Sequence, residues 1–475
     1  MKSTFVQNVL VLITGTTVAQ IIPIVFAPVL SRLYAPEDFG IFALCMAIVS
    51  FLSIISTGRY ELAIMLPKRE GDALSIAILS VLIVTVISIT MFLLLWIFYE
   101  QIILYDGNLE ISKWLYFIPL MVFFMGTYQT LNYWTTRKKQ YKTLAITSTI
   151  QKAVMVFTNL FIGINRQSSS GLIVGALSGQ CVANSGLAWH VWKHDRKKIR
   201  SITWDSIKRN ATIYKRFPIY SMPYSLIGIF SSRFIVFALS AIGFVQVAGF
   251  VDFSRSILNV PIALLSSAIG QVFFQEASFS MDTHRIEQIV MKLLIRITEL
   301  FTPLFIFFVV WSSDIFKVAF GAKWSDAGVY AAALAPASFC LLFTSWLDRI
   351  YEISLRQNTA LLLQICFDVI CILLTVGLLY MGVTPVICVF VLSMVTFLYN
   401  AIWLRITFKI AGFSLDGLYG LFRKLLVLIA ASFIVLYFLL MFPVPRIVTF
   451  IFGVIILISY YFYLFFKQIK AKFTT

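Results

Sequence analysis

The feature that most constrains the fold of this chain is a series of apolar segments, each about 20 residues long, separated by short polar intervals. An α-helix of about that length crosses the roughly 30 Å hydrocarbon core of a bilayer. About fourteen such segments take up about 290 of the 475 residues, so little of the chain is left for a soluble domain. The segments lie near 9–30, 39–57, 74–99, 114–134, 143–164, 171–192, 219–241, 247–270, 289–311, 328–348, 360–381, 384–405, 425–442 and 446–466.

The composition also indicates a membrane protein. Hydrophobic residues make up 60% of the chain and charged residues 12%, whereas a soluble domain is about 45–50% apolar. We therefore expect an all-α integral membrane protein with about 14 transmembrane helices. A cleaved signal peptide is the alternative for the first segment, because Lys2 precedes it and residues 17–19 resemble a cleavage site. The apolar run continues to Leu30, however, which is longer than the apolar region of a signal peptide.

The lysines and arginines predict the orientation. With the N-terminus in the cytoplasm, the outward loops hold few basic residues: Arg32, Lys113, Arg166, Lys317, Lys323 and Arg446. The inward segments then hold Arg59, Lys68, Arg69, Arg137, Lys138, Lys139, Lys142, nine residues between Lys193 and Arg216, Arg285, Lys292, Arg356, Arg405, Lys409, Arg423, Lys424 and the lysines at 467, 470 and 472. The positive-inside rule places both termini in the cytoplasm. The net charge of +17 is thus mostly a topology signal, and we expect no nucleic-acid partner.

The longest polar interval divides the chain. Residues 193–217 follow the sixth segment, which predicts an N-lobe of six spans over 1–192, a basic cytoplasmic linker over 193–217, a C-lobe of six spans over 218–406, and a terminal helix pair with a cytoplasmic tail over 407–475. The segments LSRLYAPEDFG (30–40) and LSAIGFVQVAG (239–249) share Leu-Ser and a final Gly, and each lies at the outward turn of the first hairpin in its lobe. This weak repeat favours parallel repeats and an alternating-access transporter.

Charged residues lie inside the predicted spans. An ionised side chain facing lipid costs at least about 2.5 kcal/mol, so these residues should face a bundle interior or a hydrated cavity. Asp252 and Arg255 are three residues apart, as are Arg296 and Glu299, so each carboxylate can partly neutralise its neighbour; internal ion pairs are the alternative to a functional role. The set is Lys152, Arg233, Asp252, Arg255, Arg296, Glu299 and Asp368.

The balance of these charges favours an anionic substrate. Four of the seven are positive and three negative, and Arg233 has no partner on its own helix. Arg233 and Arg255 are expected at a similar depth, within about one helical turn. Arginine binds phosphate through two parallel hydrogen bonds and keeps its charge when desolvated. We therefore expect a cavity that accepts a phosphate-bearing cargo.

Metal and cofactor motifs are not found in the sequence. The six cysteines all fall inside apolar spans, where a free cysteine packs as a small hydrophobe. There is no CxxC, HExxH, GxGxxG or Walker sequence, and the chain has only three histidines. We expect no cofactor and no metal site.

Four segments resemble a known family. VLSRLYAPEDFGIFAL (29–44), RYELAIMLPK (59–68), VPIALLSSAIGQVFFQEAS (260–278) and AFGAKWSDAG (319–328) are similar to the polysaccharide flippases often called Wzx, in the multidrug/oligosaccharidyl-lipid/polysaccharide exporter superfamily. The resemblance implies two six-helix lobes around a central cavity that opens alternately to the two sides. It also implies transport of an undecaprenyl-pyrophosphate-linked oligosaccharide across the bacterial inner membrane, coupled to an ion gradient, for surface polysaccharide such as O antigen or capsule.

Roles for single residues follow from this resemblance as hypotheses. We expect Arg233, Arg255 and Lys152 to bind the substrate, and Glu299, Asp368 and Asp252 to be candidates for coupling to H⁺ or Na⁺. Arg59 and Glu61, with Arg296, are candidate gate residues. Further expectations are an outer gate shaped by Pro36, Gly40, Gly321 and Trp324, for which plain turns and interfacial anchoring are the alternatives, and a basic segment 193–217 that lies on the membrane surface.

Three rival functions remain open. A flippase for lipid-linked peptidoglycan precursors handles nearly the same cargo chemistry, and a multidrug exporter of the same superfamily would want an acidic cavity. A membrane glycan polymerase or ligase is the alternative of another class, and it would need a sizeable outward catalytic loop, whereas the longest outward loops here are short. We therefore expect a transporter and not an enzyme, with membrane lipids, the lipid-linked oligosaccharide and polymerase machinery as its partners.

Overall fold

The structure is a computed structural model. It describes residues 2–106, 114–165, 168–279, 283–347, 350, 357–441, 443 and 445–473. Lys113, Arg166 and Arg356, which entered the topology argument, lie outside the described residues, as do the side chains of Lys2, Arg285 and the three tail lysines. The described part of the chain contains helices and no β-strand, which confirms the all-α prediction.

Each predicted span coincides with one long helix. Twelve helices in the described residues are long and apolar enough to cross a membrane. The predicted count of fourteen is not confirmed, because the apolar part of α1 is described only as the shorter stretch Thr17–Leu33 and α6 contains many polar residues. The long helices are α1 (Lys2–Leu33), α2 (Pro36–Thr57), α4 (Glu70–Asp106), α6 (Phe117–Arg137), α7 (Tyr141–Asn165), α8 (Ser170–Arg200), α10 (Met222–Ala241), α11 (Val245–Phe279), α12 (Thr283–Phe320), α13 (Ser325–Thr344), α15 (Gln357–Tyr380), α16 (Pro385–Ala411), α17 (Leu415–Met441) and α18 (Arg446–Phe473).

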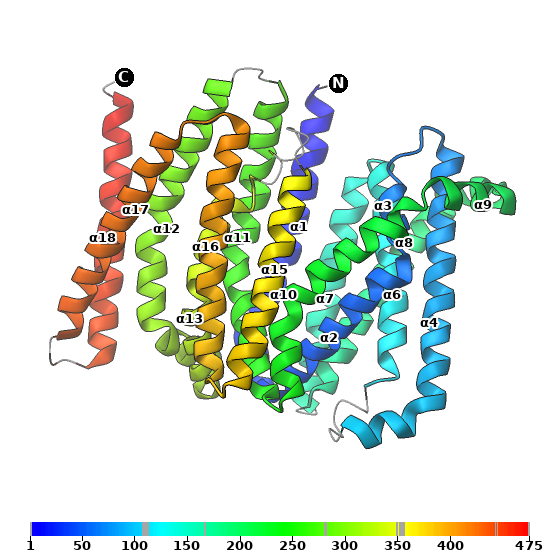
Figure 1. The fold of residues 1–475 in the computed structure, drawn as a ribbon, viewed down its shortest axis with the longest axis horizontal. Coiled ribbons are helices and arrows are strands. Elements are labelled where there is room, and N and C mark those ends of the chain that lie inside the picture. Colours follow the sequence, from blue (N-terminus) through cyan, green and yellow to red (C-terminus); the bar gives the residue numbers. More distant parts are fainter. Residues whose placement is uncertain are drawn as a thin grey trace. The chain divides into compact units, whose positions relative to one another are not determined.

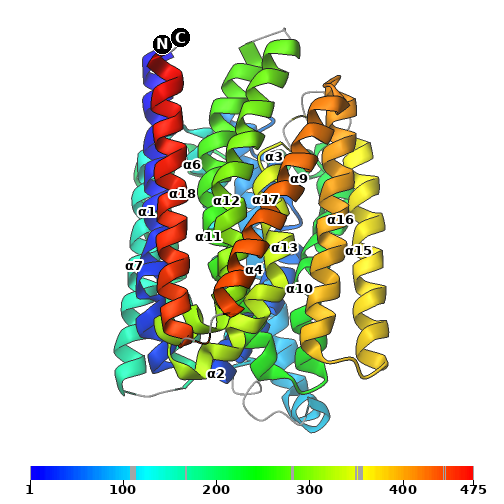
Figure 2. The ribbon, with the colours of Figure 1, turned by 90° about the vertical axis from the view of Figure 1, so that its left-hand side faces the viewer.

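Contacts group the chain into two compact units, Met1–Phe253 with Asp368–Val376 (unit 1), and Ser254–Phe367 with Gly377–Thr475 (unit 2). The predicted lobe boundaries stay a prediction. In unit 1, α1 lies beside α7 and α7 beside α8 (Figures 1 and 2), while α6 packs against α2, α4 and α8. The short helices α3 (Tyr60–Ala63) and α9 (Trp204–Ile213) and the π-helix η1 (Phe217–Ser221) also belong to unit 1.

Tyr34 holds three helices of unit 1 together. It lies in the turn between α1 and α2, is fully buried, and donates a hydrogen bond of 2.5 Å to the carbonyl oxygen of Asn159 in α7. Burial, with a contribution from the Asp38 carboxylate, raises the pKa of Tyr34 to about 12, so the hydroxyl keeps the proton that it donates. Gly163 and Gly171 flank the ring, and a Cβ on either would press into it.

Unit 2 is built around α12 and α13, which pack against each other (Figure 1). Close approach is possible because Gly328 of α13 faces the backbone of Ser312 and Ser313, where a Cβ would stand 2.5–2.6 Å from backbone atoms. α16 packs on the other side of α13, and the Thr344 hydroxyl donates to the side-chain oxygen of Asn400 at 2.7 Å. α17 packs on α12, and the 3₁₀ turn η2 (Ala322–Trp324) precedes α13.

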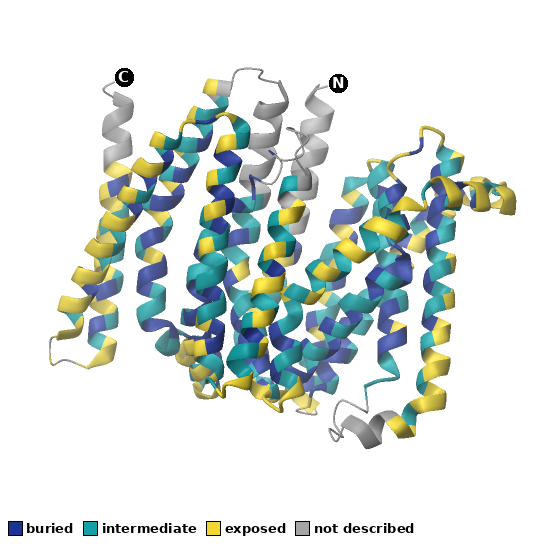
Figure 3. Ribbon diagram, viewed as in Figure 1, coloured by how far each residue is buried: buried dark blue, intermediate teal, exposed yellow. Residues whose placement is uncertain are grey.

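Exposed apolar side chains cover the outer helices of each unit (Figure 3). In unit 1, Phe157 of α7 is 73% exposed, and in unit 2, Leu426 of α17 is 65% exposed. Such extended apolar surface would be an interaction or aggregation site in water. In a chain with twelve potential spans it is the surface that faces lipid.

Candidate functional site

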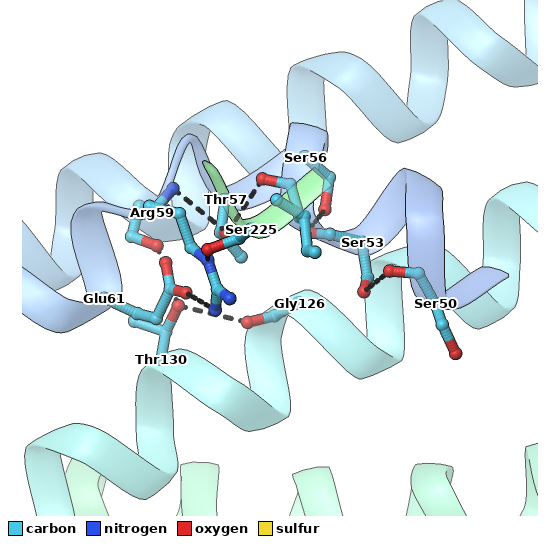
Figure 4. A network of polar contacts seen from close by, with 11 residues as sticks. Ser50, Ser53, Ser56, Thr57, Arg59, Glu61, Gly126, Thr130 and Ser225 are labelled. Carbon is cyan, nitrogen blue, oxygen red and sulfur yellow. Dashed lines mark hydrogen bonds and ion pairs between the residues drawn. The ribbon is translucent and has the colours of Figure 1, made fainter. Parts of the chain in front are cut away.

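Arg59 and Glu61 form a polar cluster just after α2 (Figure 4). Gly58 ends α2 with φ 56°, and Arg59 follows with φ 59°, a left-handed conformation that is uncommon for a residue with a side chain. This turn directs the guanidinium back toward Glu61, whose Oε1 lies 3.2 Å from Nη1 of Arg59. The Nε of Arg59 donates to the hydroxyl of Ser225 in α10 at 2.9 Å. The predicted pair of gate residues is therefore a contact, and it also joins α10.

Glu61 is the most buried carboxylate of this cluster. Its side chain is 0% exposed, and Oε2 has no hydrogen-bond partner among the described residues. A buried ionised oxygen without a donor costs free energy. A proton or a small cation on Oε2 would remove that cost.

A polar face of α2 leads to this carboxylate. Ser50, Ser53 and Ser56 recur every three residues, and each hydroxyl donates to a carbonyl of its own helix (Figure 4). On α6, Gly126 packs against Ser56, and the Thr130 hydroxyl donates to the Gly126 carbonyl at 3.1 Å. These serines were not predicted from the sequence, although hydroxyls at every third position of an apolar span are a visible signal.

Arg233 of α10 bonds to Asp252 of α11. Its Nη1 lies 2.6 Å from Oδ1 of Asp252, and the two side chains are 32% and 20% exposed. Two residues earlier on α10, Ser231 donates to Oδ1 of the buried Asp368 at 2.8 Å. Arg233, which had no predicted partner on its own helix, thus has one on the next, and a predicted substrate-binding residue pairs with a predicted ion-coupling carboxylate within unit 1.

We expect Arg233→Ala to destabilise the protein more than the double variant Arg233→Ala with Asp252→Ala. The single change leaves the Asp252 carboxylate without its cation, whereas the double change removes both charges. Breaking a fully buried pair costs about 3–5 kcal/mol, and the partial exposure here should reduce that to about 1–2 kcal/mol. Thermal unfolding of the purified variants measures the order, and a double variant less stable than Arg233→Ala would contradict it.

Lys152 and Arg255 are the other two predicted substrate-binding residues. Lys152 lies on α7 in unit 1, is partly buried, and makes no hydrogen bond or ion pair with the residues that the structure describes. Arg255 lies on the part of α11 that belongs to unit 2 and is also partly buried. Lys152 is thus an uncompensated cation in an apolar helix, which is the property expected of a group that binds an anion.

Arg296 and Glu299 belong to a larger cluster in unit 2. Glu299 is 14% exposed and lies 3.6 Å from Arg296 and 2.6 Å from Nζ of Lys424 on α17. The Tyr460 hydroxyl of α18 donates to the Glu299 backbone carbonyl at 3.1 Å. Spacing in the sequence predicts a pair of Glu299 with Arg296 alone, and the topology prediction places Lys424 in an inward segment. Spacing could not have found Lys424, because it is 125 residues away.

An apolar cavity of about 160 Å³ lies next to this cluster, between α12, α17 and α18. Among its lining side chains only Ser432 and Tyr460 carry a polar atom. Its lining is Pro303, Phe307, Leu428, Ala431, Ser432, Val435, Leu436, Gly453, Ile456, Leu457 and Tyr460. Because Tyr460 lines the cavity and contacts Glu299, an apolar cavity adjoins a cluster with two cations and one carboxylate.

The final glycines of the weak repeat touch each other. A Cβ on Gly249 of α11 would overlap the Pro36 carbonyl oxygen and stand 2.7 Å from the Gly40 nitrogen, and a Cβ on Gly40 would overlap the Val245 carbonyl oxygen. The contact involves Pro36 and Gly40, two residues predicted to shape an outer gate, and it explains why neither Gly40 nor Gly249 has a side chain.

Gly321 and Trp324, the other residues predicted at the outer gate, lie in unit 2. Gly321 has φ 104°, and Trp324 is fully buried. Burial within unit 2 fits packing of the turn before α13 better than an anchor exposed at the membrane interface.

The comparisons with known proteins agree with this arrangement. Residues 29–329, more than half of the chain, match the family described as polysaccharide biosynthesis protein. Comparison of the sequence with curated proteins gave no significant match. Among solved structures, the lipid II flippase MurJ in an inward closed conformation aligns with 98% of this chain and 99% of its own, with a TM-score of 0.64 and 14% identity.

Two transporters of the multidrug resistance MATE type have the same fold. An inward-facing one of the MOP superfamily aligns with 84% of this chain and 95% of its own, with a TM-score of 0.54 and 14% identity. A eukaryotic one aligns with 90% and 97%, with a TM-score of 0.52 and 13% identity. At these identities the likeness shows the fold alone. The family match shows more: the chain belongs to the family of polysaccharide biosynthesis proteins, built on the fold shared by MurJ and the MATE transporters.

Proposed function

We propose that the protein flips an oligosaccharide linked by pyrophosphate to undecaprenol from the cytoplasmic to the periplasmic leaflet of the bacterial inner membrane, by alternating access, for surface polysaccharide such as O antigen or capsule. The observation that carries the proposal is the apolar cavity beside Arg296, Glu299 and Lys424. The cavity suits part of an isoprenoid chain. The two cations exceed the one carboxylate, which leaves positive charge for a phosphate. Membership of a polysaccharide biosynthesis family supports a sugar-bearing cargo.

Three further cations belong to the proposal. Lys152 has no acidic partner in the described residues, and Arg233 is part-exposed beside Asp252. Together with Arg255, these two residues would attract the pyrophosphate or acidic sugars. The excess of positive over negative charges inside the spans favours such an anionic cargo.

Coupling to a gradient of H⁺ or Na⁺ remains part of the proposal. Glu299, Asp368 and Asp252 are bonded to Lys424, Ser231 and Arg233 respectively. Glu61 is bonded to Arg59 through Oε1, and its Oε2 has no hydrogen-bond partner among the described residues. We therefore add Glu61 to the three predicted coupling carboxylates. Arg59, Glu61 and Arg296 stay proposed gate residues, both termini are proposed to be cytoplasmic, and polymerase machinery is a proposed partner.

The rival functions differ in what they require. Flipping of a lipid-linked peptidoglycan precursor needs the same combination of apolar cavity and cations, and the likeness to MurJ in fold keeps it as the second candidate. A multidrug exporter for cations would need an excess of acidic residues in its cavity, whereas the cluster at Glu299 has two cations and one carboxylate. A polymerase or ligase is less favoured, because the chain shares its fold with transporters.

The test is to fill the cavity and, separately, to remove its cation. Ser432→Phe places a ring in the cavity, and Val427→Phe is the matched control on the same helix, because Val427 is 62% exposed. Lys424→Gln removes the charge, and Lys424→Arg keeps it. In the native host, we would measure membrane levels of the protein, surface polysaccharide, and lipid-linked oligosaccharide in the cytoplasmic leaflet.

We expect Ser432→Phe and Lys424→Gln to lower surface polysaccharide about tenfold or more, a loss of about 1.4 kcal/mol in cargo interaction, while precursor accumulates inside. Val427→Phe and Lys424→Arg should keep near-normal polysaccharide. Accumulation of peptidoglycan precursor instead would favour the second candidate. Normal polysaccharide in Ser432→Phe at normal protein levels would refute a role of the cavity in transport.

A further inference from the structure

The end of α8 extends beyond what a membrane span needs. α8 runs without a break from Ser170 to Arg200, and its 31 residues measure about 46 Å at 1.5 Å per residue, against a hydrocarbon core of roughly 30 Å. Trp189 and Trp192 are 70% and 47% exposed, and exposed tryptophans are typical of the membrane–water interface. The residues that follow Trp192 therefore lie at the level of the lipid headgroups, within about 12 Å of it along the helix.

Polar contacts fix α9 beside the start of α4. Figure 1 shows α9 lying across the direction of α4. Asn210 is 2% exposed and donates to the Ser75 hydroxyl at 2.7 Å and to Asp72 at 3.2 Å. Arg209 bonds to Asp72 at 2.7 Å, and Lys198 at the end of α8 bonds to Glu70 at 2.7 Å. The end of α8 and α9 are thus held in place by their contacts with Glu70, Asp72 and Ser75 of α4.

The remaining basic residues of this segment form no ion pair within the described residues. Asp195 is buried and bonded to Trp134 and Lys138, and Lys208 lies 5.9 Å from the Trp204 ring. Figure 3 shows α9 to be largely exposed. The side chains of six exposed basic residues make no hydrogen bond or ion pair within the described part of the chain: Lys193, Arg196, Lys197, Arg200, Lys215 and Arg216. We call these six residues the basic platform.

We propose that the basic platform binds the headgroups of anionic phospholipids at the membrane surface. Of the two acids of the segment, Asp195 is occupied with internal contacts and Asp205 is exposed, so the outward charge is largely positive. Along α8, Lys193, Arg196 and Lys197 lie within about 8 Å of Trp192, which is about one Debye length. Trp204 is 59% exposed and supplies an amphipathic ring of the kind found at membrane interfaces. A soluble acidic partner would explain the charges but not the exposed tryptophans around them.

The test uses the whole protein in nanodiscs of neutral phosphatidylcholine mixed with phosphatidylglycerol. The first variant carries Lys197→Gln, Arg200→Gln, Lys215→Gln and Arg216→Gln, which removes four charges and no internal contact. The matched control carries Lys197→Arg, Arg200→Lys, Lys215→Arg and Arg216→Lys, which keeps the charge. The readout is enrichment of phosphatidylglycerol over phosphatidylcholine in the lipid retained by the protein, at low and high salt.

We expect wild type and control to enrich phosphatidylglycerol, and salt to weaken the enrichment. Each basic residue near the surface contributes about 1 kcal/mol, or about fivefold, so the four Gln substitutions should lower the enrichment at least tenfold. Equal enrichment in the Gln variant and the control would overturn the proposal and leave the platform to a soluble acidic partner. The result is independent of the cargo, because no step of transport is measured.

Discussion

Gly249→Ala is expected to lower the thermal stability of the protein and to impair its transport, although alanine favours helix formation over glycine by about 1 kcal/mol. The new Cβ would overlap the Pro36 carbonyl oxygen and approach Gly40 of α2. These are backbone atoms, so no side chain can rotate away and the two helices must separate. Overpacking of this kind costs about 1–3 kcal/mol.

The contact offers two internal checks. Gly228 of α10 has no atom within 4 Å of an added Cβ, so Gly228→Ala is the matched control and should leave the melting temperature unchanged or slightly raised. Gly40→Ala should be as harmful as Gly249→Ala. The double variant should cost less than the sum of the two, because helices that have already separated accommodate the second Cβ.

Thermal melting of the four purified variants measures this, and surface polysaccharide in the native host measures the effect on transport. The close crossing exists only in the conformation in which α2 and α11 are packed together. An added Cβ therefore disfavours this conformation relative to others in which the two helices are apart. If Gly249→Ala melts like Gly228→Ala, the close crossing of α2 and α11 does not contribute to the stability of the protein.

The sequence predicted what depends on local pattern. Spans of about 20 apolar residues gave the helices, because their length and hydropathy are properties of neighbouring residues. The weak repeat ending at Gly40 and Gly249 pointed to equivalent turns, although only the structure brought the two glycines into contact.

Ion pairs between side chains on different helices could not be predicted in the same way. Spacing paired Asp252 with Arg255 and Glu299 with Arg296, because residues three apart share a helix face. The bonds from Arg233 to Asp252 and from Lys424 to Glu299 depend on how helices pack, and no periodicity contains that information. The burial of Glu61 could not be predicted for the same reason, because it depends on how the helices pack. The neighbouring Arg59 is equally typical of a residue at the membrane surface.

The second large effect is expected at Arg59 and Glu61. Arg59→Ala leaves a fully buried carboxylate without its cation, and removing one partner of a buried pair costs about 3–5 kcal/mol; with Arg59 21% exposed, the lower end is expected. Glu61→Gln keeps the shape and leaves Arg59 its bond to Ser225, so it should cost about 1 kcal/mol. The double variant Arg59→Ala with Glu61→Gln has no charge left to bury and should melt well above Arg59→Ala.

If Glu61 couples transport to an ion, its variants should lose transport even where they keep their stability. In that case Glu61→Gln and the double variant fold but fail to export, because an amide cannot exchange a proton or hold a cation as a carboxylate does. If the pair only locks α2 to α10, transport should return with stability, and the double variant should export nearly as well as wild type. Surface polysaccharide measured at equal membrane levels decides between the two, and export by the double variant would remove Glu61 from the coupling residues. The unpartnered Oε2 of Glu61 would then reflect only the free-energy cost of burying this carboxylate.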